Sequence, residues 1–347
     1  VRHGGMARGM GQEGEMRNSR GGQFAALISG AAVLACLLGL HAASTRAGTI
    51  PLPPEARQAM DDIYGGDPDA AVAIARTLEQ SQPDHPLGFL LEAEAQWWKI
   101  YCQALEIKWG MVDGWKRGKQ PGDRAYMELA EKIIALSRQQ IAKSDSVEMR
   151  VYAGIGWALE ARLYSLRGEN RGVARAGVNA REQFIRALAL DPDQADATAG
   201  LGLYNYYVDT LSTFVKMLRF FMGIPGGNKE LGLRQMQAGI DRGALLAVDT
   251  RFYLARNLRT YDHEYQKALN IAQPLAERYP ANPVFLLLTG NLNVELGHDA
   301  EAAKYFNSVV KLRPAISPCQ GCSGCAGCAA CLASAVRVAQ TYLRALP

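Results

Sequence analysis

The sequence predicts an all-helical protein built from repeated helical hairpins, and three observations support this. Ala, Leu, Arg and Glu dominate the middle of the 347-residue sequence while runs rich in Val, Ile and Thr are scarce, which favours helix over strand. One pattern, a small residue followed by an apolar residue four positions on and a proline twelve positions on, occurs four times. The last two copies lie 34 residues apart. Together these features predict an α-solenoid of two-helix units.

The first 47 residues are expected to be an export signal and not part of the fold. An uncharged run, Phe24–Leu40, follows basic residues and is itself followed by small residues up to Ala47, which is the layout of a cleaved secretory signal. Residues before Met16 form an upstream extension. Two alternatives stay open: lipidation at Cys36, or retention of the apolar run as a membrane anchor. Each predicts an exported protein of the periplasm or cell envelope.

Four stretches share the second-helix pattern in one register. The small residue belongs where the two helices of a hairpin cross, because a larger side chain would push the backbones apart. The apolar positions that follow fall on one buried stripe, and the proline ends the helix because it cannot continue a helix interior. A fifth copy, starting at Gly232, lacks the closing proline. The four complete copies run from Ala71 to Pro83, Ala180 to Pro192, Ala268 to Pro280 and Ala302 to Pro314.

First helices carry the matching half of the unit. A small residue comes ten positions after a repeat proline, at Gly202 and Gly290 for example, and Leu201 and Tyr206 complete a Leu-Gly-aromatic element displaced by one residue. The stretch Pro51–Pro314 therefore resembles the tetratricopeptide repeat (TPR) family, as a divergent exported bacterial-type member. The resemblance implies a right-handed superhelix whose first helices line a concave face. It also implies a non-enzymatic scaffold that binds a protein or peptide.

The repeat array is expected to span residues 48–316, with insertions near 101–124 and 208–227. The second insertion begins with apolar residues at helical spacing, which predict an amphipathic helix over 208–222. That helix either packs within the array or lies against a membrane. Residues 317–347 are expected to form a Cys/Gly/Ala low-complexity segment and a terminal helix.

Four residues are candidates for a peptide-binding groove. The 34-residue register puts Asn257 and Asn291 at equivalent first-helix positions, with Tyr253 and Leu287 one turn earlier on the same face. Paired Asn side chains can hold a peptide backbone or a carboxylate. The lysines that accompany them in carboxylate-binding TPR proteins are absent here, so solvated groove asparagines are the alternative. The aromatic residues of segment 97–101 are expected to pack inward.

Five of the seven cysteines form a regular run near the C-terminus. Consecutive C-x2-C pairs can bind zinc or part of an iron–sulfur cluster, which makes the run a weak candidate for a metal- or redox-linked module. Against this, oxidising conditions outside the cell favour disulfides, and a helix would spread thiols spaced by three around its surface. We therefore expect no cofactor, and we expect the run to be dispensable for folding. Its members are Cys319, Cys322, Cys325, Cys328 and Cys331.

Charge and motif content argue against nucleic-acid binding and catalysis. The net charge is +4, but five basic and only two acidic residues lie in the first 47 positions, so the remaining chain is nearly neutral and lacks a phosphate-tracking stripe. The H-E-x-x-H, G-x-S-x-G and P-loop patterns do not occur. The sequence thus predicts a scaffold for a protein or peptide partner. A metal or redox module and a membrane-associated envelope component are the alternatives.

Overall fold

The computed structural model describes residues 48–210, 225–313 and 325–347. The predicted signal segment and most of the predicted 208–222 helix lie outside these ranges. Among the described residues, no helix has both the length and the apolar character that crossing a membrane requires. The described chain is helical apart from one short β-hairpin.

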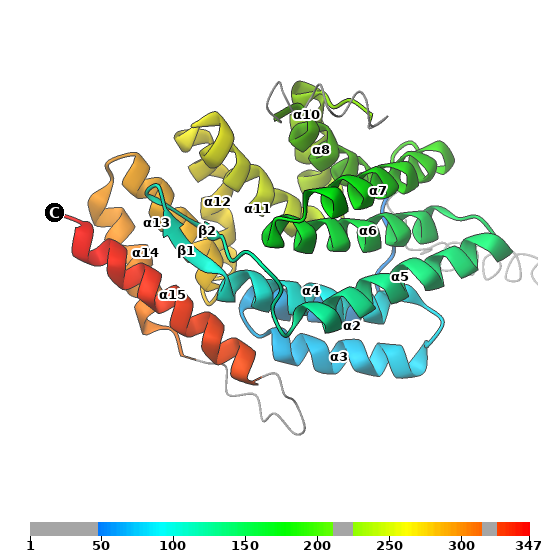
Figure 1. Ribbon diagram of the computed structural model, residues 1–347, viewed down its shortest axis with the longest axis horizontal. Helices are drawn as coiled ribbons and strands as arrows, with labels where there is room; N and C mark the ends of the chain where they lie inside the picture. The colour runs from blue at the N-terminus through cyan, green and yellow to red at the C-terminus, as the bar shows by residue number, and fades with distance from the viewer. Residues whose placement is uncertain (1–47, 211–224, 314–324) are drawn as a thin grey trace, which may run out of the picture. The chain divides into compact units, whose positions relative to one another are not determined.

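Six antiparallel helical hairpins follow one another along the described chain, and a single helix, α15, comes last (Figure 1). Each helix buries its apolar stripe against its neighbours. The hairpins pair α2 (Pro54–Gly65) with α3 (Pro68–Ser81), α4 (Pro86–Gln103) with α5 (Asp123–Lys143), α6 (Val147–Arg167) with α7 (Asn170–Leu190), α8 (Ala195–Thr210) with α10 (Lys229–Arg242), α11 (Ala247–Asn257) with α12 (Tyr265–Arg278), and α13 (Pro283–Glu295) with α14 (Asp299–Lys311), while α15 is Cys325–Ala345.

Small residues stand where the helices of a hairpin cross, as the repeat pattern predicts. A Cβ atom on Gly290 of α13 would lie 2.7 Å from the ring of Phe306 in α14. A Cβ atom on Gly202 of α8 would lie 2.7 Å from the main-chain nitrogen of Met236 in α10. Ala302 in α14 is fully buried. The prediction of an all-α array of TPR-like hairpins is confirmed.

The first insertion contains an element that the sequence analysis did not foresee. Strands β1 (Leu105–Lys108) and β2 (Met111–Gly114) pair antiparallel, with Leu105 opposite Gly114. The two-residue turn consists of Trp109 and Gly110, which have φ angles of 53° and 77°. Two successive positive φ angles match the right-handed twist of the strands. Such turns are usually predicted from Asn-Gly or Asp-Gly, so the Trp-Gly sequence is only a weak signal for a turn.

Contacts between distant hairpins supplement those between neighbours. The hydroxyl of Tyr64 in α2 donates to Asp249 in α11 at 2.9 Å, and the side chain of Asn282, just before α13, donates to the carbonyl of Tyr64 at 2.9 Å. In an ordinary solenoid each repeat contacts only the next one. Here the first hairpin also packs on the fifth and sixth.

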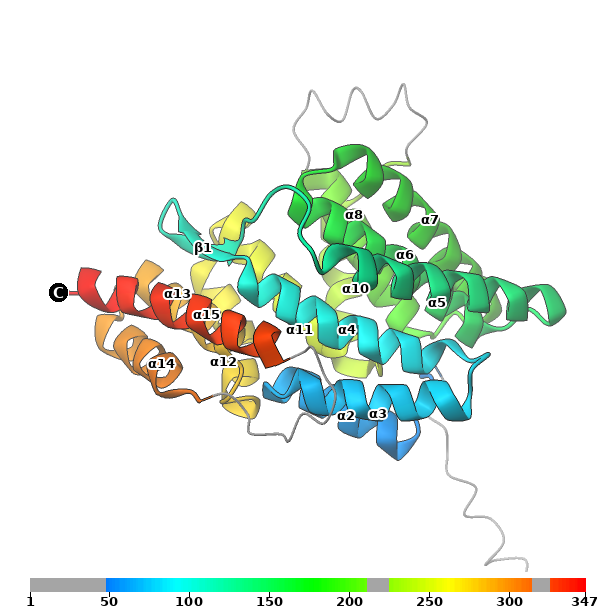
Figure 2. The same cartoon turned by 60° about the horizontal axis from the view of Figure 1, so that its bottom comes forward.

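The terminal helix is bonded covalently to the first half of the array. Cys331 in α15 forms a disulfide with Cys102 near the end of α4, with the Cα atoms 4.9 Å apart. Figures 1 and 2 show α15 alongside α14 and close to α4. That the cysteine run is dispensable for folding stays a prediction, and Cys331 is the member whose replacement would remove this bond. The sequence hid this pairing because 229 residues separate the two cysteines.

An aromatic cluster joins α4 to the later hairpins. The ring of Trp98 meets Phe252 of α11 and Phe285 of α13 edge-on, at centroid distances of 5.1 and 5.2 Å. Tyr101 meets Phe252 in the same way at 5.6 Å. These side chains are buried, as is Trp97, so the prediction that the aromatic residues of this segment pack inward is confirmed.

Candidate functional site

The four predicted groove residues are buried. Tyr253 and Asn257 lie on α11, and Leu287 and Asn291 lie on α13. The exposed fraction is 8% for Tyr253 and at most 1% for the other three. We refer to these four positions as the inner face. Their burial contradicts the expectation of an open or solvated groove, and the β-hairpin contacts this face at Asn291.

Both asparagines form hydrogen bonds within the chain, although Nδ2 of Asn257 has no partner among the described residues. Asn257 Oδ1 accepts from the hydroxyl of Tyr207 at 3.0 Å. Asn291 Oδ1 accepts from Arg259 at 2.9 Å, and its Nδ2 donates to the carbonyl of Gly110, in the turn of the β-hairpin, at 3.0 Å. The hairpin main chain thus takes a bond that a bound peptide would need. Peptide binding at these four positions stays a prediction, and it requires the hairpin to move away.

A buried ion cluster ties the hairpin to α11. Asp113 of β2 receives a two-pronged contact from Arg256, with Nε 2.9 Å from Oδ1 and Nη2 2.7 Å from Oδ2. Arg259 lies 3.6 Å from the same Oδ2, and Tyr101 donates its hydroxyl to Oδ1. Burial alone would raise the pKa of Asp113, but the two guanidinium groups outweigh it and lower that pKa. Asp113 is therefore a carboxylate at neutral pH.

The turn after α11 brings the second arginine inward. Residues Leu258–Asp262 form one π-helical turn, η1, and His263 follows in the left-handed region with φ 54°. Such widened turns often accompany functional sites, because the extra residue per turn redirects side chains. Here Arg256 and Arg259 both reach the same carboxylate. Arg259 is 1% exposed, and burial, the largest cause, lowers its pKa.

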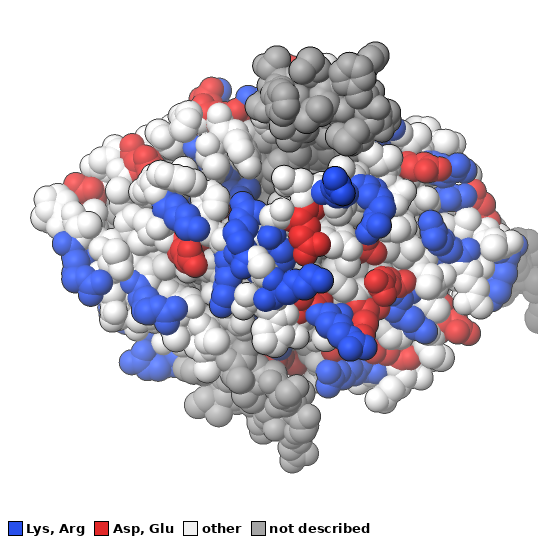
Figure 3. Space-filling view, in the orientation of Figure 1, with Lys and Arg blue, Asp and Glu red and all other residues white. Residues whose placement is uncertain are grey.

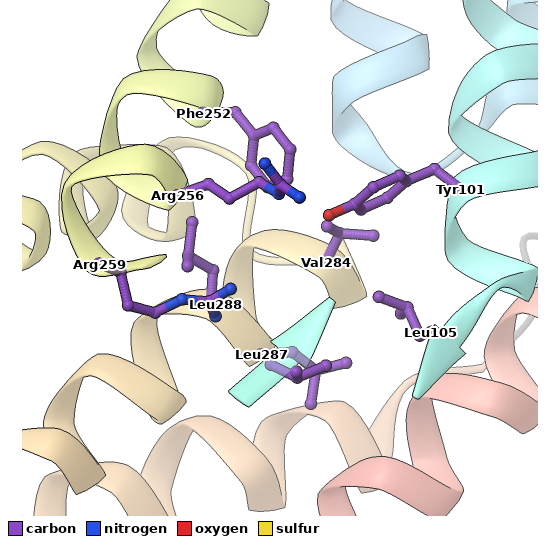
Figure 4. A pocket seen from close by; sticks show the side chains of 9 residues that line it. Tyr101, Leu105, Phe252, Arg256, Arg259, Val284, Leu287 and Leu288 are labelled. Atoms are coloured by element: carbon purple, nitrogen blue, oxygen red, sulfur yellow. The ribbon is translucent and has the colours of Figure 1, made fainter. Parts of the chain in front are cut away.

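These arginines line a small pocket between α4, the β-hairpin, α11 and α13 (Figure 4). In the figure both arginines enter the space from the side opposite Tyr101 and Leu105. The enclosed part has room for about one water molecule. What the pocket offers chemically is positive charge within apolar walls. The full lining is Tyr101, Leu105, Val112, Phe252, Arg256, Arg259, Val284, Leu287 and Leu288.

A second buried cluster includes Asp249, near the start of α11. Arg162 of α6 pairs with Glu94 of α4 at 2.5 Å and with Asp249 at 3.5 Å. Two carboxylates share one guanidinium in a buried setting, and burial raises the pKa of both, that of Glu94 to about 7. This cluster links three hairpins. It also predicts a change in stability with pH.

The burial and pairing of the charged residues in both clusters were not predicted from the sequence. Arg256 and Arg259 stand next to predicted groove positions, yet arginines are common on exposed helix faces and carry no signal of burial. Asp113 lies in an insertion whose strands were not foreseen. A weak signal existed: Val112, Asp113 and Gly114 put one acid beside an apolar residue in a short extended run.

The candidate metal ligands are accounted for only in part. Cys331 is in a disulfide, so it offers no thiolate in this structure. Cys319 and Cys322 lie outside the described residues, as do the side chains of Cys325 and Cys328. Among the residues that the structure describes, no group of three or more His, Cys, Asp or Glu side chains could hold a metal ion.

Comparisons with known proteins add little. No family model matches the sequence, and no curated protein matches it significantly. Among solved structures, the chain is similar to the C-terminal part of a TPR repeat-containing protein from Cytophaga hutchinsonii, with 17% sequence identity and a TM-score of 0.32. The match covers 74% of this chain and 78% of that chain. The fold assignment rests on the hairpins described above.

Proposed function

We propose that this chain is a non-enzymatic repeat scaffold that binds a protein partner at the tip of its β-hairpin. The observation that carries the proposal is Trp109, whose exposed fraction of 80% far exceeds that of any other large apolar side chain among the described residues. Tryptophan is enriched among the residues that dominate binding energy in protein interfaces. The predicted inner groove is closed by the hairpin, so the tip is the better candidate.

The tip is held in place before any partner arrives. The carbonyl of Gly110 accepts from Asn291 at 3.0 Å and from the hydroxyl of Tyr342 in α15 at 2.7 Å. The ring of Trp109 lies edge-on to Trp115 at 5.4 Å, and the ammonium of Lys108 lies 5.5 Å from the centre of the Trp115 ring. A fixed anchor loses little conformational entropy on binding, which favours affinity.

The segment that follows the β-hairpin is basic, which favours an acidic partner. Lys116, Arg117 and Lys119 are exposed in the segment after β2, whereas Asp113 and Asp123 are buried against arginines of the core. Figure 3 shows Lys and Arg side chains gathered in the middle of the face where this segment crosses in Figure 1. Complementary charge speeds association and rejects wrong partners.

A protein fits this surface better than a lipid bilayer. A single exposed tryptophan is an ordinary interface anchor, whereas stable attachment to a membrane needs a larger apolar area or a second anchor. We also propose that the chain acts outside the cytoplasm, in the periplasm or cell envelope. The signal-like Phe24–Leu40 run and the disulfide between Cys102 and Cys331 support this, since disulfides persist in oxidising compartments.

The test is site-specific photo-crosslinking in the producing cells. A photo-reactive amino acid replaces Trp109 in one variant and Leu190, an exposed residue at the end of α7, in the control. We expect a discrete protein adduct at position 109 only, and we expect Lys116→Glu with Lys119→Glu to reduce it strongly. The proposal fails if position 109 gives no adduct or gives the same adducts as position 190. Binding of the purified chain to anionic vesicles, lost in Trp109→Ala, would favour the membrane alternative.

A further inference from the structure

The pocket beside β2 contains more positive than negative charge. Arg256 and Arg259 both pair with Asp113, and among the described residues no other carboxylate pairs with either arginine. A buried ion without a counter-ion costs several kcal/mol, so buried charges are ordinarily matched. Two guanidinium groups around one carboxylate leave one positive charge unmatched.

Arg259 is the arginine with the weaker contacts. Its Nη1 donates to Asn291 at 2.9 Å, and its Nη2 donates to Thr260 at 3.4 Å and lies 3.6 Å from Asp113. Its Nε has no hydrogen-bond partner, although the side chain is only 1% exposed. Several buried polar atoms of the described residues lack a partner, and Arg259 is the residue among them that lines this pocket, so its Nε points to an unseen water, ion or ligand there. The pocket that Arg259 lines is the space from which an acceptor would reach it.

The other buried cluster does not supply the missing negative charge. Glu94 and Asp249 exceed Arg162 by one carboxylate, but both contact Arg162. Asp249 precedes Arg256 by two helical turns, which is about 10 Å along the helix. Since Coulomb energy falls with distance, a charge at that separation offsets Arg259 far less than an ion in contact would.

We propose that this pocket binds a small monovalent anion of about the size of chloride against Arg256 and Arg259. The anion would accept from Arg259 Nε and bring the cluster of two arginines and Asp113 to neutrality. The enclosed space admits a group about as large as one water molecule, which excludes bulky anions. The apolar walls formed by Leu105, Val284 and their neighbours suit an anion with few other polar groups. This site is separate from the partner surface at Trp109.

The test compares melting temperatures of the full chain in sodium chloride and sodium gluconate at equal ionic strength. Gluconate carries the same charge but is too large for the pocket. Because a ligand stabilises the folded state that binds it, we expect chloride to raise the melting temperature saturably, by about 2–4 °C at ten times its dissociation constant. Arg259→Met should abolish the rise, whereas Arg251→Met, on α11 but outside the pocket, should keep it.

Two results would overturn the proposal. One is a wild-type melting temperature that does not depend on which anion is present, and the other is an Arg259→Met variant that keeps the full rise. If Arg259→Met does not fold, broadening of the ³⁵Cl NMR signal of chloride by wild-type protein decides the matter. We expect broadening that added bromide reverses. No broadening, or broadening that bromide leaves unchanged, means that the pocket binds no such anion.

Discussion

Breaking the disulfide between Cys102 and Cys331 should destabilise the protein by several kcal/mol. The bond closes a loop across a sequence separation of 229 residues, nearly the whole described array. A cross-link removes conformational entropy from the unfolded chain, and the loss grows with the logarithm of loop length. For a loop of about 230 residues this relation gives about 5 kcal/mol at 25 °C. Measured effects are more often 2–4 kcal/mol, so we expect a loss of about 2–5 kcal/mol.

The assay is urea unfolding followed by circular dichroism, with and without dithiothreitol. Four other cysteines of the run could exchange with the bond, so the parent protein carries serine at each of them. In this parent, reduction should lower the unfolding midpoint, and Cys102→Ser with Cys331→Ser should remove the response to dithiothreitol. The reasoning is refuted if the parent loses less than about 1 kcal/mol on reduction, or if the double variant still responds. The four serine substitutions are at Cys319, Cys322, Cys325 and Cys328.

Three further outcomes follow from the packing and charges. Ala302→Leu should lower the unfolding free energy by about 1–3 kcal/mol because it overpacks a helix crossing. Substitution of the exposed Lys304 by Ala should lower it by less than about 0.5 kcal/mol. Equal losses in thermal unfolding would contradict the predicted repeat register. Asn291→Ala should lower the unfolding free energy by about 1–3 kcal/mol, because it leaves Arg259 and the carbonyl of Gly110 without their buried partner. An unchanged unfolding midpoint would mean that Asn291 does not hold the β-hairpin in place. Burial raises the pKa of Glu94 from 4.5 in the unfolded chain to about 7, so the folded state holds the proton more tightly. The unfolding free energy should therefore fall as pH rises from about 4.5 to 7, by at most about 3 kcal/mol. Glu94→Gln should flatten this slope, and an equal slope in both proteins would rule Glu94 out as its source.

The repeat architecture could be read from the sequence because its determinants are local. Gly290 and Ala302 are small because two helices cross there, and a proline such as Pro280 follows the end of a helix at a fixed distance. These constraints recur with the 34-residue period, so one chain contains several copies of the same evidence. The inward packing of Trp98 followed from helical spacing in the same way.

The burial of the inner face could not be predicted from the sequence, because the contacts that cause it join residues that are distant in sequence. The register predicts Asn291 at a groove position, but its side chain donates to the carbonyl of Gly110, which lies 181 residues earlier. The β-hairpin itself depends on a Trp-Gly turn held by α13 and α15, and not on a strong local turn signal. Likewise, the partner of Cys331 is fixed only by the packing of α15 on α4.

The claim on which this account depends most is that the chain's own β-hairpin covers the inner face and presents Trp109 outward. Hydrogen–deuterium exchange of the full chain tests this directly, by comparing amides of Leu105–Gly114 with those of α13. If the hairpin is held as described, its paired amides should exchange about as slowly as those of α13, because both open only on extensive unfolding. Exchange of the hairpin amides within seconds, with α13 still protected, would contradict the account. It would show instead that the hairpin opens readily and that Tyr253, Asn257, Leu287 and Asn291 can face a peptide.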